Sequence, residues 1–113
     1  MNALNSIIIE GNLTRDPEVK DLGNGGKVCT LSIAVNRTYK AADGSMVDEV
    51  SYFEIDAFGN MADACLKSAS KGRGIRVVGR LKQNRWTDNE GKSHSKVIII
   101  AEHIEFKSIK EPR

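Results

Sequence analysis

Apolar and polar residues alternate along most of the chain, in runs that are separated by glycine-containing turns. A period of two residues is typical of strands that bury one face, so the pattern predicts a mainly β protein. We expect five strands, over residues 6–13, 28–40, 50–58, 74–86 and 95–106. The turns expected at 24–26, 43–44 and 88–91 lie between these strands.

One segment between the third and fourth strands follows a helical period instead. Asn60 is placed to cap the start of this helix, and Gly72 lies just past its end. Its apolar residues are Met61, Ala62, Cys65, Leu66 and Ala69. Five strands with one helix between strands 3 and 4 is the element order of an OB-fold, a five-stranded Greek-key barrel. The alternatives are a hairpin array or a small sandwich with a helical cover.

The chain has 113 residues, which is enough for one domain with a modest core. We expect the OB-fold domain at 1–107 and a loose tail at 108–113. No apolar run is long enough to cross a membrane and no signal sequence is visible, so a cytoplasmic protein is expected. Cys29 and Cys65 are expected to be reduced and buried. His94 and His103 have no partner at metal-ligand spacing, so we expect no metal and no cofactor.

An enzyme is not favoured. Residues 74–80 come near a phosphate-binding loop, but Arg80 stands where that motif needs Lys, and Leu81 where it needs Ser or Thr. The segment also lies inside an expected strand rather than before a helix. No credible nucleophile, base and orienting acid can be assembled, so a binding protein is the better prediction.

Charge is distributed unevenly, although the net charge is only +2. Between Leu66 and Thr87 every charged residue is basic, which indicates either a solvated face or a cationic groove. These residues are Lys67, Lys71, Arg73, Arg76, Arg80, Lys82 and Arg85. Acidic residues lie elsewhere, and five of the fifteen gather at 43–56.

Strand parity predicts which side chains point outward. In the fourth strand Ile75, Val77 and Leu81 share the core face with Gly79. Trp86, the one tryptophan of the chain, is expected on the other face with the basic residues, although it could instead fold back as a lid on the core. The outward set is Arg76, Val78, Arg80, Lys82, Asn84 and Trp86.

The third strand shows the same arrangement, with Phe53, Ile55 and Ala57 expected to point inward. Tyr52 and Phe58 are expected outward, together with Glu54 and Asp56. In the second strand the inward parity of Leu31, Ile33 and Val35 continues into Arg37 and Tyr39. Since an arginine does not continue a core, we expect Arg37, Tyr39 and Lys40 on a projecting hairpin arm.

Aromatic rings beside cations on a solvent face are typical of single-stranded nucleic-acid binding, because rings stack on bases while cations follow the phosphates. A subunit contact is the alternative explanation for the exposed rings. The predicted binding residues are Trp86, Tyr52, Phe58, Tyr39, Arg37, Lys40, Lys71, Arg73, Arg76, Arg80, Lys82 and Arg85.

Two isoleucine-rich runs, 7–9 and 97–100, are apolar at both parities. A strand with one face exposed to water should not be apolar at both parities, so both faces of these strands must be covered. Loops of the same chain could provide part of the cover, but a second subunit is favoured. We therefore expect a homo-oligomer with Ile7, Ile8 and Ile9 in its interface.

The chain resembles the bacterial single-stranded DNA-binding protein family from Ile8 to Phe106. The resemblance is carried by several motifs, whose order and spacing together are specific. They are Glu10–Glu18 (EGNLTRDPE), Asn24-Gly25-Gly26, Tyr52–Gly59, Lys71-Gly72, Val78-Gly79-Arg80-Leu81, Arg85-Trp86-Thr87-Asp88 and Gly91.

The resemblance implies a homotetramer that wraps single-stranded DNA with little sequence preference in replication, recombination and repair, at the bacterial nucleoid. It also implies base stacking on Tyr39, Tyr52, Phe58 and Trp86, with basic family positions at Lys71 and Arg85. Glu54 and Asp56 depart from the pattern, since they would repel a nearby phosphate. The acidic tip by which many relatives recruit replication and repair proteins is not visible at 111–113. An OB-fold that binds RNA, or an accessory protein of replication restart, is the alternative function.

Overall fold

The computed structural model of the chain describes residues 2–108, which form six strands and one helix. In chain order these are β1 (Ile7–Leu13), β2 (Glu18–Asp21), β3 (Lys27–Lys40), β4 (Met46–Phe58), α1 (Asn60–Ser68), β5 (Gly74–Thr87) and β6 (Ser93–Phe106). All five expected strands are present. The sixth, β2, was not expected because it contains a single apolar residue, Val19, among three charged ones.

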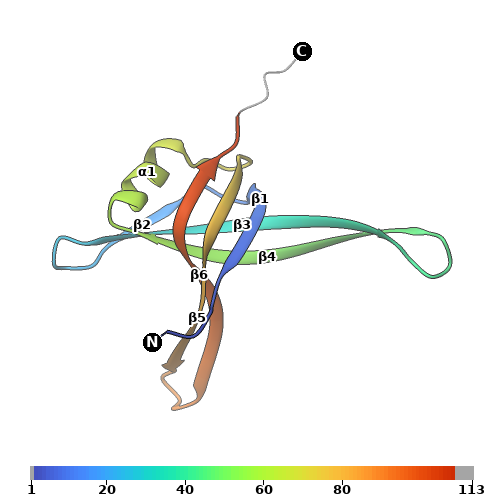
Figure 1. The fold of residues 1–113 in the computed structure, drawn as a ribbon. Helices are drawn as coiled ribbons and strands as arrows, with labels where there is room; N and C mark the ends of the chain where they lie inside the picture. The colour runs from blue at the N-terminus through green and yellow to red at the C-terminus, as the bar shows by residue number, and fades with distance from the viewer. Residues whose placement is uncertain (1, 109–113) are drawn as a thin grey trace.

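Five strands close into a barrel, which confirms the OB-fold prediction. The hydrogen-bonded order is β1-β5-β6-β4-β3, and β1 pairs again with β3 to complete the circle, while β2 extends the sheet beyond β3. The pairs are antiparallel except β4 with β6, which run parallel where Ile55 faces Ile99 and Asp56 faces Ile100. Figure 1 shows the barrel strands crossing at the centre of the molecule, with α1 at one end.

The core fills the barrel from all five strands, and α1 covers one end of it. Ile33, Ile55 and Ile75 are fully buried, and Ala62 and Cys65 of the helix pack into the same cluster. The helix lies where its period predicts, but the expected capping by Asn60 is wrong. Gly59 is the N-cap residue, with φ 63°, so no side chain caps the start of the helix. Its place in the left-handed region explains why a glycine stands there.

At Gly79 of β5 the backbone of the neighbouring strand β6 lies very close. A Cβ atom at this position would lie 2.1 Å from the carbonyl oxygen of Ile100, so no larger residue fits. The register with β6 shifts between Val78 and Gly79, because Val78 faces His103 whereas Gly79 faces Ala101. Glu102 is therefore the additional residue of a bulge on β6, and the alternation of β5 is preserved.

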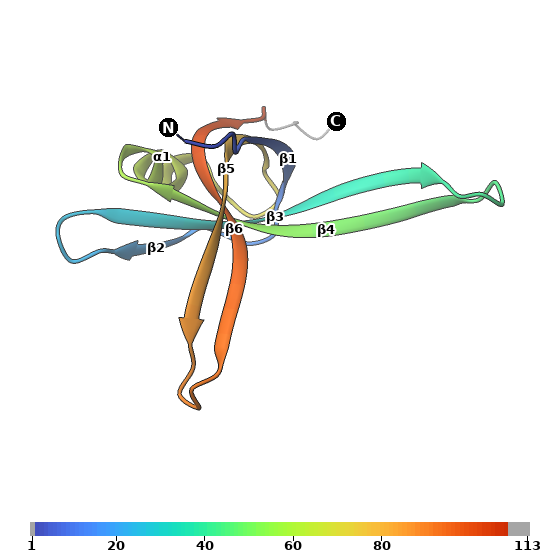
Figure 2. The same ribbon diagram turned by 60° about the horizontal axis from the view of Figure 1, so that its bottom comes forward.

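Two long hairpins project from the barrel as arms. The β3–β4 pair continues to Lys40 opposite Met46, and the β5–β6 pair continues to Thr87 opposite Ser93. Figures 1 and 2 show the arms leaving the barrel in different directions. The predicted hairpin arm at 37–40 is thus confirmed. Leu81 and Phe53 were wrongly expected in the core: both keep the core parity, but they lie where the strands leave the barrel, and both are exposed.

The run at 97–100 is covered by the chain itself. Ile98, Ile99 and Ile100 are all buried, while Val97 is exposed on the β5–β6 arm. Ile99 belongs to the barrel core, and Ile98 and Ile100 have the opposite parity on the outer side of β6. The chain itself therefore supplies the cover of these three isoleucines, for which a second subunit was favoured. Most of the expected tail lies outside the described residues, at 109–113.

Candidate nucleic-acid interface

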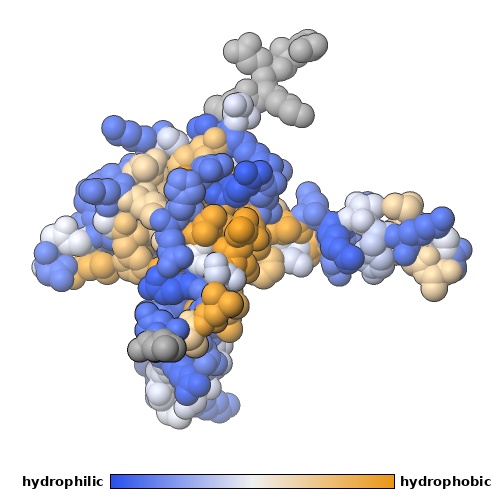
Figure 3. Space-filling model, viewed as in Figure 1, coloured by the Kyte–Doolittle hydropathy of each residue, from blue (hydrophilic) through white to orange (hydrophobic). Residues whose placement is uncertain are grey.

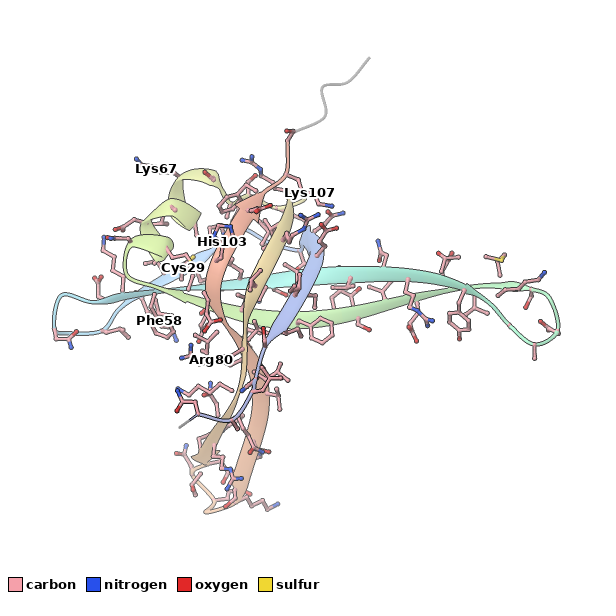
Figure 4. All side chains as sticks on the ribbon, in the orientation of Figure 1. Cys29, Phe58, Lys67, Arg80, His103 and Lys107 are labelled. Carbon is pink, nitrogen blue, oxygen red and sulfur yellow. The ribbon has the colours of Figure 1, made fainter. Side chains whose placement is uncertain are left out.

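The outward side chains of β4, β6 and β5 form one surface, which we call the aromatic face. The register fixes it, because Asp56 of β4 is opposite Ile100 of β6, and Ile100 is opposite Arg80 of β5. Figure 4 shows Phe58 and Arg80 on the side of the β3–β4 ribbon from which the β5–β6 arm projects. The face comprises Tyr52, Glu54, Asp56, Phe58, Arg80, Lys82, Asn84, Trp86, His94 and Lys96, together with Ile98 and Ile100, which have the same parity but are buried.

Trp86 stands on this face near the tip of the β5–β6 arm, with 48% of its surface exposed. It is therefore not a lid on the core. Its ring stacks on that of His94, with 5.5 Å between centroids and 17° between planes. A cavity of about 430 Å³ at this end of the arm is lined by both rings and by five residues of the opposite parity, Gln83, Arg85, Thr87, Ser93 and Ser95.

Asp88 holds this end of the arm in shape. One carboxylate oxygen accepts backbone N–H groups of Glu90 and Lys92 across the turn, each at 2.9 Å. The other lies 2.7 Å from Nε2 of His94. The hydrogen bond to His94, followed by those to the backbone, holds the pKa of Asp88 below its ordinary value of 3.8. The turn thus fixes the imidazole against which Trp86 packs.

Tyr52 and Phe58 are exposed at the two ends of the barrel part of β4. Beside Tyr52 is a second cavity, of about 240 Å³, lined by Arg15, Ser32, Phe53, Glu54 and Lys96. Sequence reasoning missed Arg15, His94 and Lys96. The parity of β6 could have placed His94 and Lys96 beside the tryptophan, whereas Arg15 lies between strands, where no period applies.

Tyr39, Arg37 and Lys40 lie far out on the β3–β4 arm, with Tyr39 on the opposite parity from Tyr52. The guanidinium of Arg37 lies 5.0 Å from the centroid of the Tyr39 ring and 3.8 Å from the Glu49 carboxylate. One face of this ring is therefore already in contact with a cation. Lys40 is the last residue of β3 and is exposed.

In the fold, acidic side chains of neighbouring strands pair with part of the basic run. Arg76 forms ion pairs with Glu10 of β1 and Glu105 of β6, and Arg80 lies 3.5 Å from Glu102. Hydrogen bonds from Lys107 and then Arg76 hold the pKa of Glu10 below its ordinary value of 4.5. The cross-strand acids come from distant parts of the chain, so the sequence spacing could not reveal them.

The other predicted cations are divided among three places. Lys82 is exposed on the aromatic face, opposite Ile98. Arg85 has the opposite parity from Trp86, and it donates to Oε1 of Gln83 at 3.0 Å. Lys71 and Arg73 line a cavity of about 630 Å³ that also includes Lys107, and Figure 4 places Lys107 at the end of the barrel away from Arg80. Arg73 is anchored there by hydrogen bonds to the carbonyls of Ser68 and Lys107.

Of the three isoleucines of β1, one points away from the barrel. Ile7 and Ile9 pack against the core, whereas Ile8 is 71% exposed and pairs with Val78 of β5. Figure 3 shows hydrophobic surface over β1, bordered by hydrophilic residues. A contiguous exposed apolar patch is typical of a contact surface.

Cys29 and Cys65 are free thiols that are fully buried in the same core cluster. Burial, followed by the neighbouring Cys29, raises the pKa of the Cys65 thiol to about 12. Residues 2–108 contain no group of three His, Cys, Asp or Glu side chains that could hold a metal ion. Over the same residues no helix has the length and hydropathy to span a membrane.

Residues 4–107 match the single-strand binding protein family. The chain belongs to this family. Its relatives include proteins named single-stranded DNA-binding protein from Aquifex aeolicus, 42% identical over 101 residues, and from Wolinella succinogenes, 38% identical over 102 residues. These matches cover 89% and 90% of this chain and 68% and 63% of the relatives, so the chain spans about two thirds of their length.

Solved structures of family members have the same fold. The SSB of Plasmodium falciparum in complex with ssDNA superposes with a TM-score of 0.87 at 26% identity, covering 96% of this chain and 98% of the other. A deletion mutant of the single-stranded DNA-binding protein of Thermus aquaticus gives a TM-score of 0.83 at 26% identity, covering 93% of this chain and 51% of that one. Membership of a binding-protein family agrees with the prediction of binding rather than catalysis.

Proposed function

We propose that the chain binds single-stranded DNA with little sequence preference. The observation that carries this proposal is the aromatic face, on which Tyr52, Phe58 and Trp86 stand outside the core beside Lys82 and Lys96. Rings stack on bases of any identity, and cations contact the phosphates. Similarity to the Plasmodium falciparum protein, whose structure is of a complex with ssDNA, supports the same ligand.

The remaining predicted residues extend the path of the strand in this proposal. Tyr39, Arg37 and Lys40 would meet DNA along the β3–β4 arm, and Lys71 and Arg73 would meet it at the far end of the barrel. Arg37, Arg76 and Arg80 contribute less, because each already pairs with a carboxylate. In this proposal Arg85 contacts the DNA backbone from the side of the β5–β6 arm opposite to Trp86.

The direct test is a titration of intrinsic fluorescence with oligo-dT, since Trp86 is the one tryptophan of the chain. Binding should quench it in proportion to occupied sites, and an RNA of equal length should compete weakly. Equal competition by RNA would favour the alternative function, an RNA-binding OB-fold. No fluorescence change, together with no binding by anisotropy, would refute both.

Assembly is the second part of the proposal. Covering Ile8 removes apolar surface from water in every subunit, and fully burying such a side chain is worth roughly 1.5–3 kcal/mol. We expect a homotetramer, around which a long strand would gain effective concentration at each successive site. Ile8→Lys should yield smaller species by light scattering that still bind short oligonucleotides. A wild-type monomer at micromolar concentration would contradict this part. Roles in replication, recombination and repair, with location at a bacterial nucleoid, belong to the same proposal.

A further inference from the structure

A carboxylate already holds one of the cations of the aromatic face. Lys96 of β6 forms an ion pair with Glu54 of β4, across the parallel contact of the two strands. Glu54 is two residues from Tyr52, and Lys96 is two residues from His94, which stacks on Trp86. The Glu54–Lys96 pair therefore lies between the proposed stacking rings of β4 and β5. A DNA strand that contacts the rings of both β-strands would pass over this pair.

The two partners differ in how far they face solvent. The side chain of Glu54 is 27% exposed, whereas that of Lys96 is 54% exposed and lines the cavity beside Tyr52. A ligand in this cavity can therefore reach the side chain of Lys96. The other carboxylate of the face, Asp56, is occupied differently, because it accepts a hydrogen bond from Thr30 at 2.9 Å.

We propose that Lys96 contacts the DNA backbone beside Tyr52 and that Glu54 is a built-in competitor with phosphate for the Lys96 ammonium. A carboxylate and a phosphate offer the same anionic oxygen acceptors, so binding exchanges one partner of Lys96 for the other. This inference rests on the proposed function. It explains how a face with two carboxylates can still accept DNA, and it predicts that affinity is held below what the cations alone would provide.

The first test is Glu54→Gln, which keeps the shape of the side chain and removes its charge. An exposed ion pair contributes little, so relieving the competition should tighten binding of oligo-dT by about two- to fivefold. The dependence of log affinity on log salt should also become steeper by roughly 0.7, which is the value for one additional phosphate neutralised on a single strand. The double variant Glu54→Gln/Lys96→Gln should lose both changes.

Asp63→Asn is the matched control. Asp63 lies on α1 and pairs with Lys27 at 3.2 Å, so this variant changes the net charge equally, at a surface pair outside the aromatic face. It should leave affinity and salt slope unchanged. If it tightens binding as much as Glu54→Gln does, the effect is general electrostatics and the inference is wrong.

The remaining outcomes separate this inference from the proposed function. Failure of the wild-type protein to bind oligo-dT would refute the proposed function. Wild-type binding with no gain in Glu54→Gln, or a double variant that binds like Glu54→Gln, would overturn the inference alone, since Lys96 would then make no DNA contact. Thermal unfolding checks that each variant folds. Should Glu54→Gln unfold, Glu54→Thr suits a strand and has the same expected result.

Discussion

Replacement of Trp86 by alanine tests the central assignment of the proposed function. The indole is 48% exposed and packs on His94, outside the core cluster. Truncation therefore leaves no cavity in the barrel, and the free energy of unfolding should change by less than about 1 kcal/mol. Stacking on one base is worth about 1–3 kcal/mol, which corresponds to a roughly 5- to 150-fold loss of affinity for single-stranded DNA.

Because this variant has no tryptophan, affinity is best measured by fluorescence anisotropy of a labelled dT oligonucleotide. The matched control is Val97→Ala on the same arm. Val97 is exposed on the parity opposite to that of Lys96 and His94, facing Gln83 across the hairpin. The control should bind like the wild type. Unchanged affinity in Trp86→Ala, together with a large loss of stability, would show that the indole supports the arm rather than the ligand.

Three further predictions concern the fold. Gly79→Ala should destabilise the protein by about 3 kcal/mol, because its Cβ would clash with backbone, whereas Gly74→Ala should cost less in denaturant unfolding, since its closest contact, at 3.0 Å, is a flexible lysine side chain. The pKa of Glu10 is lowered in the folded state, so its stabilising contribution is complete above its ordinary pKa of 4.5 and is lost as pH falls through the lowered value. As pH is lowered through that window, the thermal midpoint of Glu10→Gln should therefore decrease less steeply than that of the wild type. Neither buried thiol should react with a maleimide in the native state, whereas rapid labelling of Cys65 would show that the barrel opens at α1.

Much of the fold could be predicted from local pattern. Alternation identified all five barrel strands, and the helical period placed α1 between the third and fourth of them. The outward position of Trp86, Tyr52 and Phe58 also followed from parity, because β5 keeps its alternation through Gly79. The projecting arm followed from Arg37, since a charged residue at core parity indicates that a strand has left the barrel.

Other features depended on which distant segments meet. The sequence shows a basic run at 67–85 without acids, yet Arg76 and Arg80 face carboxylates of β1 and β6 across the sheet. The Glu54–Lys96 pair has the same origin, because it requires the parallel contact between β4 and β6. Ion pairs between strands depend on sheet order and register, and neither is visible in the residues of one strand.

The isoleucine runs show the same division between sequence and tertiary structure. Their pattern predicted that both faces would be covered, for residues 7–9 and for residues 97–100 alike. Only the tertiary structure decided what covers them. Ile98 and Ile100 are buried within the chain, whereas Ile8 on β1 and Val97 on the β5–β6 arm stay exposed. Hydrophobicity along a strand specifies that surface must leave water, but closure of the barrel decides whether the same chain can bury it.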